Sequence, residues 1–136
     1  MFKRILVAVD LTEKNKKAVA AARELAREGT EVTLLHVIET IEDVPFEELE
    51  SFYERIEQRA QEAFDELTAD GFGAGIDLTE RIAYGKRARE IVTYAEEIEA
   101  DLIILGSHTV DPERPGLTTV SYQVAVLAGC SVLLVK

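Results

Sequence analysis

The sequence has a single cysteine and no apolar run long enough to cross a membrane. One thiol, that of Cys130, excludes an internal disulfide, and a membrane-spanning helix would need about 18 consecutive apolar residues. Lys3 and Arg4 lead directly into an apolar segment typical of a strand, so we expect no signal peptide. These features predict one cytoplasmic domain, residues 1–136, with no membrane partner.

Basic side chains are scarce: 15 Lys and Arg stand against 26 Asp and Glu, which gives a net charge of −11. Such a charge repels the phosphates of nucleic acid unless a local basic patch outweighs it, so we expect no nucleic-acid partner. Most of the acid is Glu at positions expected in helices. We interpret it as a solvated helix surface that maintains solubility, with halophilic adaptation as the alternative.

Five short segments have the composition of strands. Four of them are continuous apolar runs, which is typical of parallel strands covered on both faces. The third alternates between apolar and polar residues, which suits the edge of a sheet. The five segments are Lys3–Val9, Glu31–Ile38, Asp77–Ala83, Asp101–Leu105 and Ser131–Val135.

Between the strands lie four apolar stripes with helical spacing. Gly29 suits the end of the first helix, and Pro45 and Gly71 suit the two ends of the second. The stripe of the second helix could pack on the sheet or form a seam with a partner helix. The stripes are Ala18, Ala22, Leu25 and Ala26; Leu49, Tyr53, Ile56, Ala60, Ala63 and Leu67; Ala88, Ile91, Val92, Ala95 and Ile98; and Val120, Val124, Leu127 and Ala128.

The strict alternation of strands and helices predicts an α/β fold with a parallel sheet and right-handed crossovers. Ligands of such folds bind beyond the carboxyl ends of the strands, where the strand order reverses. The residues to consider therefore follow the strands directly. They are Asp10, residues 38–40, residues 84–87 and residues 106–119.

Four segments together resemble the universal stress protein family along nearly the whole chain. They are KRILVAVD (3–10), VTLLHVIE (32–39), YGKRAREIVTYAEEIEADLIILGSHT (84–109) and CSVLLVK (130–136). The resemblance implies a five-stranded parallel sheet in the order 3-2-1-4-5 with helices on both faces, similar to the adenine nucleotide alpha hydrolases. It also implies a regulatory role in the stress response and an adenine nucleotide as ligand, with the base near Asp10 and Val37.

In nucleotide-binding members, a loop of spaced glycines and a final Ser or Thr holds the phosphates. Glycines let backbone amides approach a phosphate, and the helix that follows offers free N–H groups. This sequence keeps Gly106, but Thr109 stands at the second glycine, and Thr118 and Thr119 stand at the final pair. We therefore predict that the phosphates lie near Gly106, Thr109 and the start of the fourth helix, but bind weakly.

An acidic insert in the same loop also favours weak binding of a triphosphate. Asp111 and Glu113 would repel the phosphates if they point inward. Two like charges about 4 Å apart cost roughly 4 kcal/mol at an effective dielectric constant of 20, whereas a helix N-terminus stabilises a charge by about 0.3–1 kcal/mol. The ligand that the resemblance implies is ATP or AMP, with Mg²⁺ or Mn²⁺ if it is a triphosphate. The alternative is a member that binds no nucleotide.

Two of these positions also have a purely structural interpretation. Asp10 could bind a ribose or a base, or it could cap the first helix. Thr118 and Thr119 could contact an anion or act as ordinary helix caps. The basic residues Lys86, Arg87 and Arg89 belong to the same rim and could equally be solvated helix charges.

No motif in the sequence identifies the protein as an enzyme. It has neither a nucleophile elbow nor a P-loop, so a hydrolase or nucleotidyl transferase on a similar fold lacks motif support. The two histidines and one cysteine do not form a spaced set of metal ligands. We expect His36 in the core, His108 near the ligand, and the thiol of Cys130 to be packed and inert.

The last strand predicts a homodimer. Ser131–Val135 has neither proline nor charge, and in the expected order it is an edge of the sheet. An exposed apolar edge favours aggregation unless it is covered. A second copy paired with it about a twofold axis would cover it, and the family resemblance implies the same association.

Overall fold

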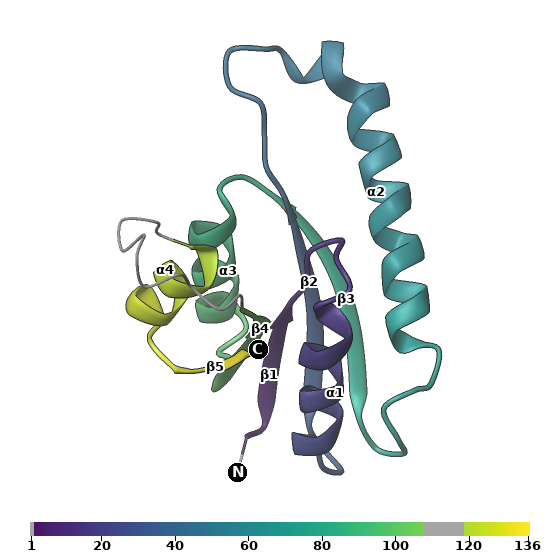
Figure 1. Cartoon of the computed structure of the whole chain (residues 1–136), viewed down its shortest axis with the longest axis vertical. Helices are drawn as coiled ribbons and strands as arrows, with labels where there is room; N and C mark the ends of the chain where they lie inside the picture. Colours follow the sequence, from purple (N-terminus) through teal and green to yellow (C-terminus); the bar gives the residue numbers. More distant parts are fainter. Residues whose placement is uncertain (1, 108–118) are drawn as a thin grey trace.

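The computed structural model describes residues 2–107 and 119–136, in which strands and helices alternate along the chain (Figure 1). The order of elements is the expected one. The strands are β1 (Arg4–Ala8), β2 (Glu31–Ile38), β3 (Asp77–Tyr84), β4 (Leu102–Gly106) and β5 (Ser131–Val135). The helices are α1 (Asn15–Leu25), α2 (Phe46–Thr68), α3 (Arg87–Glu97) and α4 (Val120–Leu127).

The five strands form one parallel sheet in the order β3-β2-β1-β4-β5, which confirms the predicted topology. The chain adds β2 and β3 on one side of β1, then crosses over and adds β4 and β5 on the other side. The strand order therefore reverses between β1 and β4. The alternating strand β3 lies at an edge, as its composition predicted.

Successive residues of the central strands supply two separate cores, because side chains alternate between the faces of a sheet. Ile5 and Val7 of β1 pack with α1 and α2, whereas Leu6 and Ala8 pack with α3 and α4. The helices thus cover both faces, as expected. This arrangement explains why β1, β2 and β4 are apolar at nearly every position.

Three helix positions differ from the predicted stripes. Leu25 is 37% exposed and Leu127 is 61% exposed, so both predictions of core residues were wrong. Each residue is the last of its helix. Conversely, Phe64 of α2 is almost completely buried, although the predicted stripe did not include it. Tyr53 and Ala60 are buried as expected, so α2 packs its stripe on the sheet.

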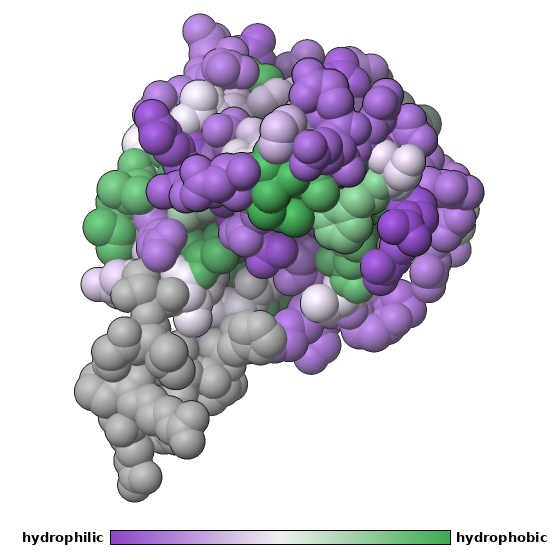
Figure 2. All heavy atoms as spheres, turned by 90° about the horizontal axis from the view of Figure 1, so that it is seen from above, coloured by the Kyte–Doolittle hydropathy of each residue, from purple (hydrophilic) through white to green (hydrophobic). Residues whose placement is uncertain are grey.

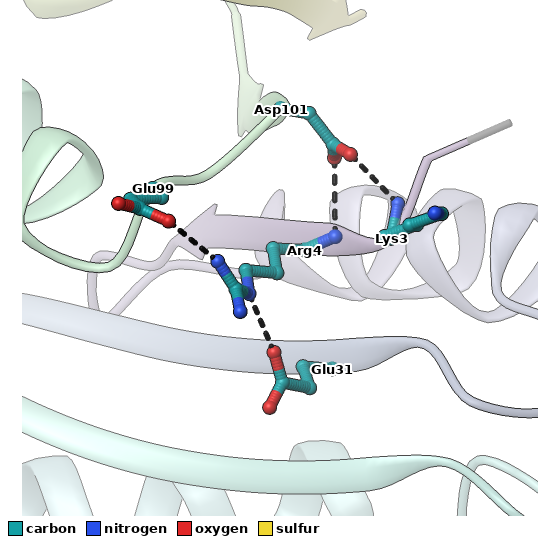
Figure 3. A network of polar contacts seen from close by, with 5 residues as sticks. All are labelled: Lys3, Arg4, Glu31, Glu99 and Asp101. Carbon is teal, nitrogen blue, oxygen red and sulfur yellow. Dashed lines mark hydrogen bonds and ion pairs between the residues drawn. The ribbon is translucent and has the colours of Figure 1, made fainter.

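The amino end of the sheet is tied together by a network of polar contacts (Figure 3). The carboxylate of Asp101 accepts hydrogen bonds from the backbone N–H groups of Lys3 (2.8 Å) and Arg4 (3.1 Å). The guanidinium of Arg4 pairs with Glu31 at 2.8 Å and with Glu99 at 2.9 Å. Hydrogen bonds and charge from Glu31 and Glu99 raise the pKa of Arg4. The contacts connect the starts of β1 and β2 with the turn before β4.

Within the described parts of the chain, no helix combines the length and the apolar character that crossing a membrane requires.

Candidate functional site

A cavity of about 370 Å³ opens at the carboxyl ends of β1 and β4. It lies at the point where the strand order reverses, which is the usual ligand site of open α/β sheets. Four of the predicted site residues line it together: Asp10, Val37, Gly106 and Thr119. The other described lining residues are Ala8, Val9, Asn15, Leu35, Arg87, Ile91, Leu105, Val120 and Ser121.

The loop after β1 holds Asp10 at the carboxyl end of this strand. Its carboxylate accepts hydrogen bonds from the backbone N–H of Thr12 (2.9 Å) and from the Thr12 hydroxyl. The N-cap of α1 is Lys14, whose side chain makes no capping bond. The alternative that Asp10 caps this helix is therefore wrong. The local turn instead orients the carboxylate, whose remaining lone pairs can accept bonds from a ligand.

Asn15 fixes the backbone of Asp10, and the sequence did not single it out. Its side-chain oxygen accepts a hydrogen bond from Asp10 N (3.1 Å), and its amide donates to Asp10 O. Asn15 is buried at the first position of α1. An asparagine at a helix start would pass for an ordinary capping residue in the sequence. Its bond to a strand end appears only in the fold.

The inner wall of the cavity is apolar. Val37 and Leu35 contribute from β2, Leu105 from β4 and Ile91 from α3. All four side chains are buried in the structure without a ligand and belong to the core shared by α3 and α4. A flat apolar wall next to a few fixed polar groups is the usual composition of a small-molecule site.

Gly106 ends β4 close to the start of α1. A β-carbon at this position would lie 3.3 Å from Cβ of Lys14 and 3.5 Å from its carbonyl oxygen. The first contact is tighter than ordinary packing and the second is not, so a larger residue here would need Lys14 to shift by a few tenths of an ångström. The glycine thus has a structural reason independent of a phosphate.

Thr119 caps α4 and lines the cavity at the same time. Its hydroxyl accepts a hydrogen bond from the backbone N–H of Tyr122 at 3.1 Å. Ser121 Oγ lies 3.0 Å from Thr119 Oγ1 and 3.3 Å from Ser107 Oγ, so three hydroxyls form a chain at this helix start. The capping interpretation is confirmed for Thr119, and the position remains suited to an anion because hydroxyls and free N–H groups meet there.

His36 is a core residue, as predicted. Its Nδ1 lies 2.8 Å from Val9 O, and the side chain is buried between β1 and β2. Burial is the main cause that lowers the pKa of His36, and the charge of Arg87 lowers it further. The bond to Val9 and the charge of Asp10 act in the opposite direction.

In the structure, Arg87 lies in a different hollow from its basic neighbours Lys86 and Arg89. It is the only cationic side chain among the described residues that line the cavity. Lys86 and Arg89 line a different hollow together with Glu39 and Glu90. The three basic residues predicted for one rim are therefore divided, and one of them can act on a ligand of this cavity.

Several predicted positions lie outside the described residues. Thr109 and Thr118 of the predicted site are among them, as are His108, Asp111 and Glu113. Within the described part of the chain, no group of three or more His, Cys, Asp or Glu side chains could hold a metal ion. Cys130 is half-buried, and burial raises the pKa of its thiol, which favours the inert protonated form as predicted.

The fold and the position of the cavity define a parallel α/β protein with a cavity at the reversal of strand order. The model of the universal stress protein family matches residues 1–136, and the chain belongs to this family. The universal stress protein YxiE of Bacillus subtilis is 28% identical over 148 aligned residues that cover all of both chains.

Solved structures show the same fold. The hypothetical protein MJ0577 is similar with a TM-score of 0.83 and 27% identity over 100% of this chain and 96% of its own. A universal stress protein in complex with cAMP has a TM-score of 0.76 at 22% identity, over 99% of this chain and 97% of its own. A universal stress protein of Archaeoglobus fulgidus in complex with dAMP has a TM-score of 0.64 at 22% identity, over 98% of both chains.

Proposed function

We propose that this universal stress protein binds an adenine nucleotide in the cavity between β1 and β4 and acts as a cytoplasmic regulatory protein of the stress response. The observation that carries the proposal is the convergence of Asp10, Val37, Gly106 and Thr119 on one cavity. These residues come from distant parts of the sequence and differ in chemistry. Together they suit the base, the sugar and the phosphate of one nucleotide.

Each part of the cavity matches one part of the ligand. The apolar wall around Val37 and Ile91 accepts the flat base, while the carboxylate of Asp10 accepts hydrogen bonds from ribose hydroxyls. The hydroxyls of Thr119 and Ser121 and the N-terminus of α4 face the phosphate. Arg87 supplies a positive charge on the same cavity. The complexes of two structural neighbours with cAMP and dAMP support an adenine nucleotide as the ligand class.

The affinity for a triphosphate is expected to be low, in the high micromolar range, or about 5–6 kcal/mol. The reason is chemical: Thr109 replaces a glycine, and Asp111 and Glu113 bring negative charge into the loop. If ATP binds only with Mg²⁺ or Mn²⁺, the acidic pair is expected to help hold the ion, and its replacement by Asn should then weaken binding.

Calorimetric titration tests the proposal. Protein that has been unfolded, dialysed and refolded is titrated with ATP, ADP and AMP, with and without Mg²⁺, so that no carried ligand interferes. We expect measurable binding that Asp10→Ala weakens roughly tenfold and that Val37→Trp abolishes by filling the cavity. Arg81→Ala, an exposed position on β3, is the matched control and should bind normally. Refolded protein that binds none of the three nucleotides would contradict the proposal.

The alternative function is that of a member that binds no nucleotide and acts through protein contacts. With either function, we propose that the protein forms a homodimer through β5. Ser107 N donates to Val135 O (2.7 Å), so the backbone of Val135 faces β4. Because neighbouring residues of a strand point their N–H and C=O groups to opposite sides, those of Val132 and Leu134 face outward. Exposed apolar side chains on the neighbouring α4 extend this surface, namely Tyr122, Val126 and Leu127.

Leu133→Lys tests the dimer. The Leu133 side chain is 37% exposed, so lysine can be placed there at little cost to the fold. Across a twofold pairing of β5, however, it brings like charges together. Light scattering should show a dimer for the unaltered protein and a monomer for Leu133→Lys. Asp77→Lys on the opposite edge strand is the control and should leave the mass unchanged. An unaltered protein that is monomeric at about 100 μM would refute the dimer.

A further inference from the structure

The end of the molecule above β2 and β3 has a surface that the cavity does not use. It consists of the β2–α2 connection and the first part of α2, residues 39–54, called here the α2 apex. Figure 1 shows that this part of α2 and the loop before it extend beyond the carboxyl ends of the strands. The apex therefore projects away from the body of the domain, where a partner has free access to it.

Apolar side chains are exposed on the α2 apex. Ile41 is 46% exposed, Val44 38% and Phe52 39%. Figure 2 shows an apolar area amid hydrophilic residues at this end of the molecule. Isolated apolar residues on a surface need no explanation, but neighbouring ones on a projecting element indicate an interaction site.

Tyr53 contacts the backbone of Ile41 and the ring of Phe52. Ile41 N donates a hydrogen bond to the Tyr53 hydroxyl at 3.0 Å, and the ring of Phe52 lies 5.7 Å from that of Tyr53. Tyr53 is itself buried and packs edge-on against Tyr84 at the end of β3. The loop and the helix are thus joined to the sheet through one buried ring, so the exposed groups keep a defined arrangement.

The charge of the α2 apex has one sign only. Its 16 residues contain seven of the 26 acidic residues of the chain and none of the 15 basic ones. Among the residues that the structure describes, none of these seven carboxylates takes part in an ion pair. The seven are Glu39, Glu42, Asp43, Glu47, Glu48, Glu50 and Glu54.

We propose that the α2 apex docks a basic amphipathic helix of a partner protein. The apolar face of such a helix would cover Ile41, Val44 and Phe52, and its Lys or Arg side chains would meet the carboxylates around them. Anionic lipids and nucleic acids are repelled by the same charge. A second copy in a twofold contact would place one acidic apex against another. The proposal does not depend on the nucleotide site.

Fluorescence anisotropy with a defined probe tests this surface. The probe is a fluorescein-labelled 18-residue helix of Leu and Lys with one apolar face. A peptide of the same composition in scrambled order, which has no apolar face, is its control. We expect the amphipathic probe to bind more tightly than the scrambled one, and its affinity to fall as NaCl is raised from 50 to 300 mM. Equal binding of the two peptides would overturn the proposal.

Matched variants locate the contact. The triple variant Ile41→Ser, Val44→Ser, Phe52→Ser and the triple variant Glu47→Gln, Glu48→Gln, Glu50→Gln should each bind the probe roughly tenfold more weakly. The controls change the same chemistry elsewhere: Leu25→Ser on α1, and Glu62→Gln, Asp65→Asn, Asp70→Asn in the last part of α2 and just after it. They should shift the affinity less than about twofold. Circular dichroism verifies that each variant is folded. Apex variants that bind like the unaltered protein, or controls that lose as much, would refute the α2 apex as the docking site.

Discussion

The two ends of the sheet differ in the contacts that their polar side chains make. At the amino end, Asp101 and Arg4 connect β1, β2 and the turn before β4 through hydrogen bonds and ion pairs. At the carboxyl end, β1 and β4 leave a cavity lined by Asp10, Val37 and Gly106. At the amino end the charged side chains are paired with one another, whereas at the carboxyl end Asp10 faces a cavity.

The connections of the chain explain this difference. After β1 the chain turns to α1 on one face of the sheet, whereas after β4 it leads to α4, which packs on the other face. Two neighbouring strands whose chains depart in opposite directions leave a gap between them. At the amino end the strands begin side by side, with Arg4 opposite Glu31, and the charged side chains there pair with one another. We therefore expect amino-end substitutions to affect stability and carboxyl-end substitutions to affect binding.

Asn15→Ala should be an exception to this division between stability and binding, and it should have the largest effect on the free energy of unfolding. The residue belongs to the carboxyl end, but its loss leaves the partly buried N–H and C=O of Asp10 without their partner. An unsatisfied buried polar group costs about 1–3 kcal/mol, so the free energy of unfolding in urea should fall by that amount. Nucleotide affinity should fall too, because Asp10 is no longer held. Glu24→Ala, an exposed change in the same helix, should alter neither quantity; an Asn15→Ala protein as stable as this control would contradict the assigned role.

Asp101→Ala should sharpen the division. It removes the carboxylate that accepts two backbone N–H groups at the start of β1. Because these bonds are partly exposed to solvent, we expect a loss of about 1–2 kcal/mol, measured by urea unfolding. AMP affinity should stay unchanged, since the cavity lies at the other end of the strands. If Asp101→Ala weakened AMP binding as strongly as Asp10→Ala, the two ends would not be independent.

His36 should make stability depend on pH. Burial holds its pKa in the folded protein below the ordinary value of 6.5. Above pH 6.5 both states are neutral at this side chain and stability is complete. As pH falls below 6.5 the unfolded chain binds the proton first, so stability decreases until the folded pKa is reached. Thermal unfolding between pH 5 and 7.5 should show this fall, and His36→Gln should flatten it.

Arg4→Ala should have the smallest effect. Its ion pairs with Glu31 and Glu99 are short, but all three side chains are largely exposed to solvent. Exposed ion pairs contribute little because solvent screens them and the side chains lose freedom. The midpoint of urea unfolding should move less than for Asp101→Ala, and 0.5 M NaCl should reduce the difference from the unaltered protein further. A larger loss than for Asp101→Ala would show that the charges, and not the backbone bonds, hold the amino end together.

Much of the fold could be predicted from local patterns. The runs Glu31–Ile38 and Ser131–Val135 were found at the predicted bounds, because branched apolar residues between turn residues have few alternatives to a buried strand. The helix stripes were less reliable. Leu127 has the spacing of a core residue yet faces solvent, and Phe64 was left out of the predicted stripe yet is buried. Periodicity describes one helix by itself and does not say where its neighbours end.

The candidate site shows the same limit. Asp10, Val37, Gly106 and Thr119 could be selected because each stands at an end of a strand or helix and matches a family motif. The partner that holds Asp10 could not be selected, because Asn15 resembles a capping residue. Arg87 was predicted on one rim with Lys86 and Arg89, and only the fold separates it from them. Their roles depend on which residues face them across the fold, and the sequence carries no local signal for that.

The sequence by itself determined the order of strands and helices, which strands are buried and the acidic character of the surface, because these depend on composition and on spacing along the chain. Only the tertiary structure decided which side chains meet. Asp10 and Thr119 are more than 100 positions apart and line one cavity because β1 and β4 are neighbours in the sheet. Ile41 lies next to α2 because its backbone N–H donates a hydrogen bond to the Tyr53 hydroxyl, 12 positions along the chain. Contacts of this kind arise from packing three-dimensional surfaces, and no local pattern encodes them.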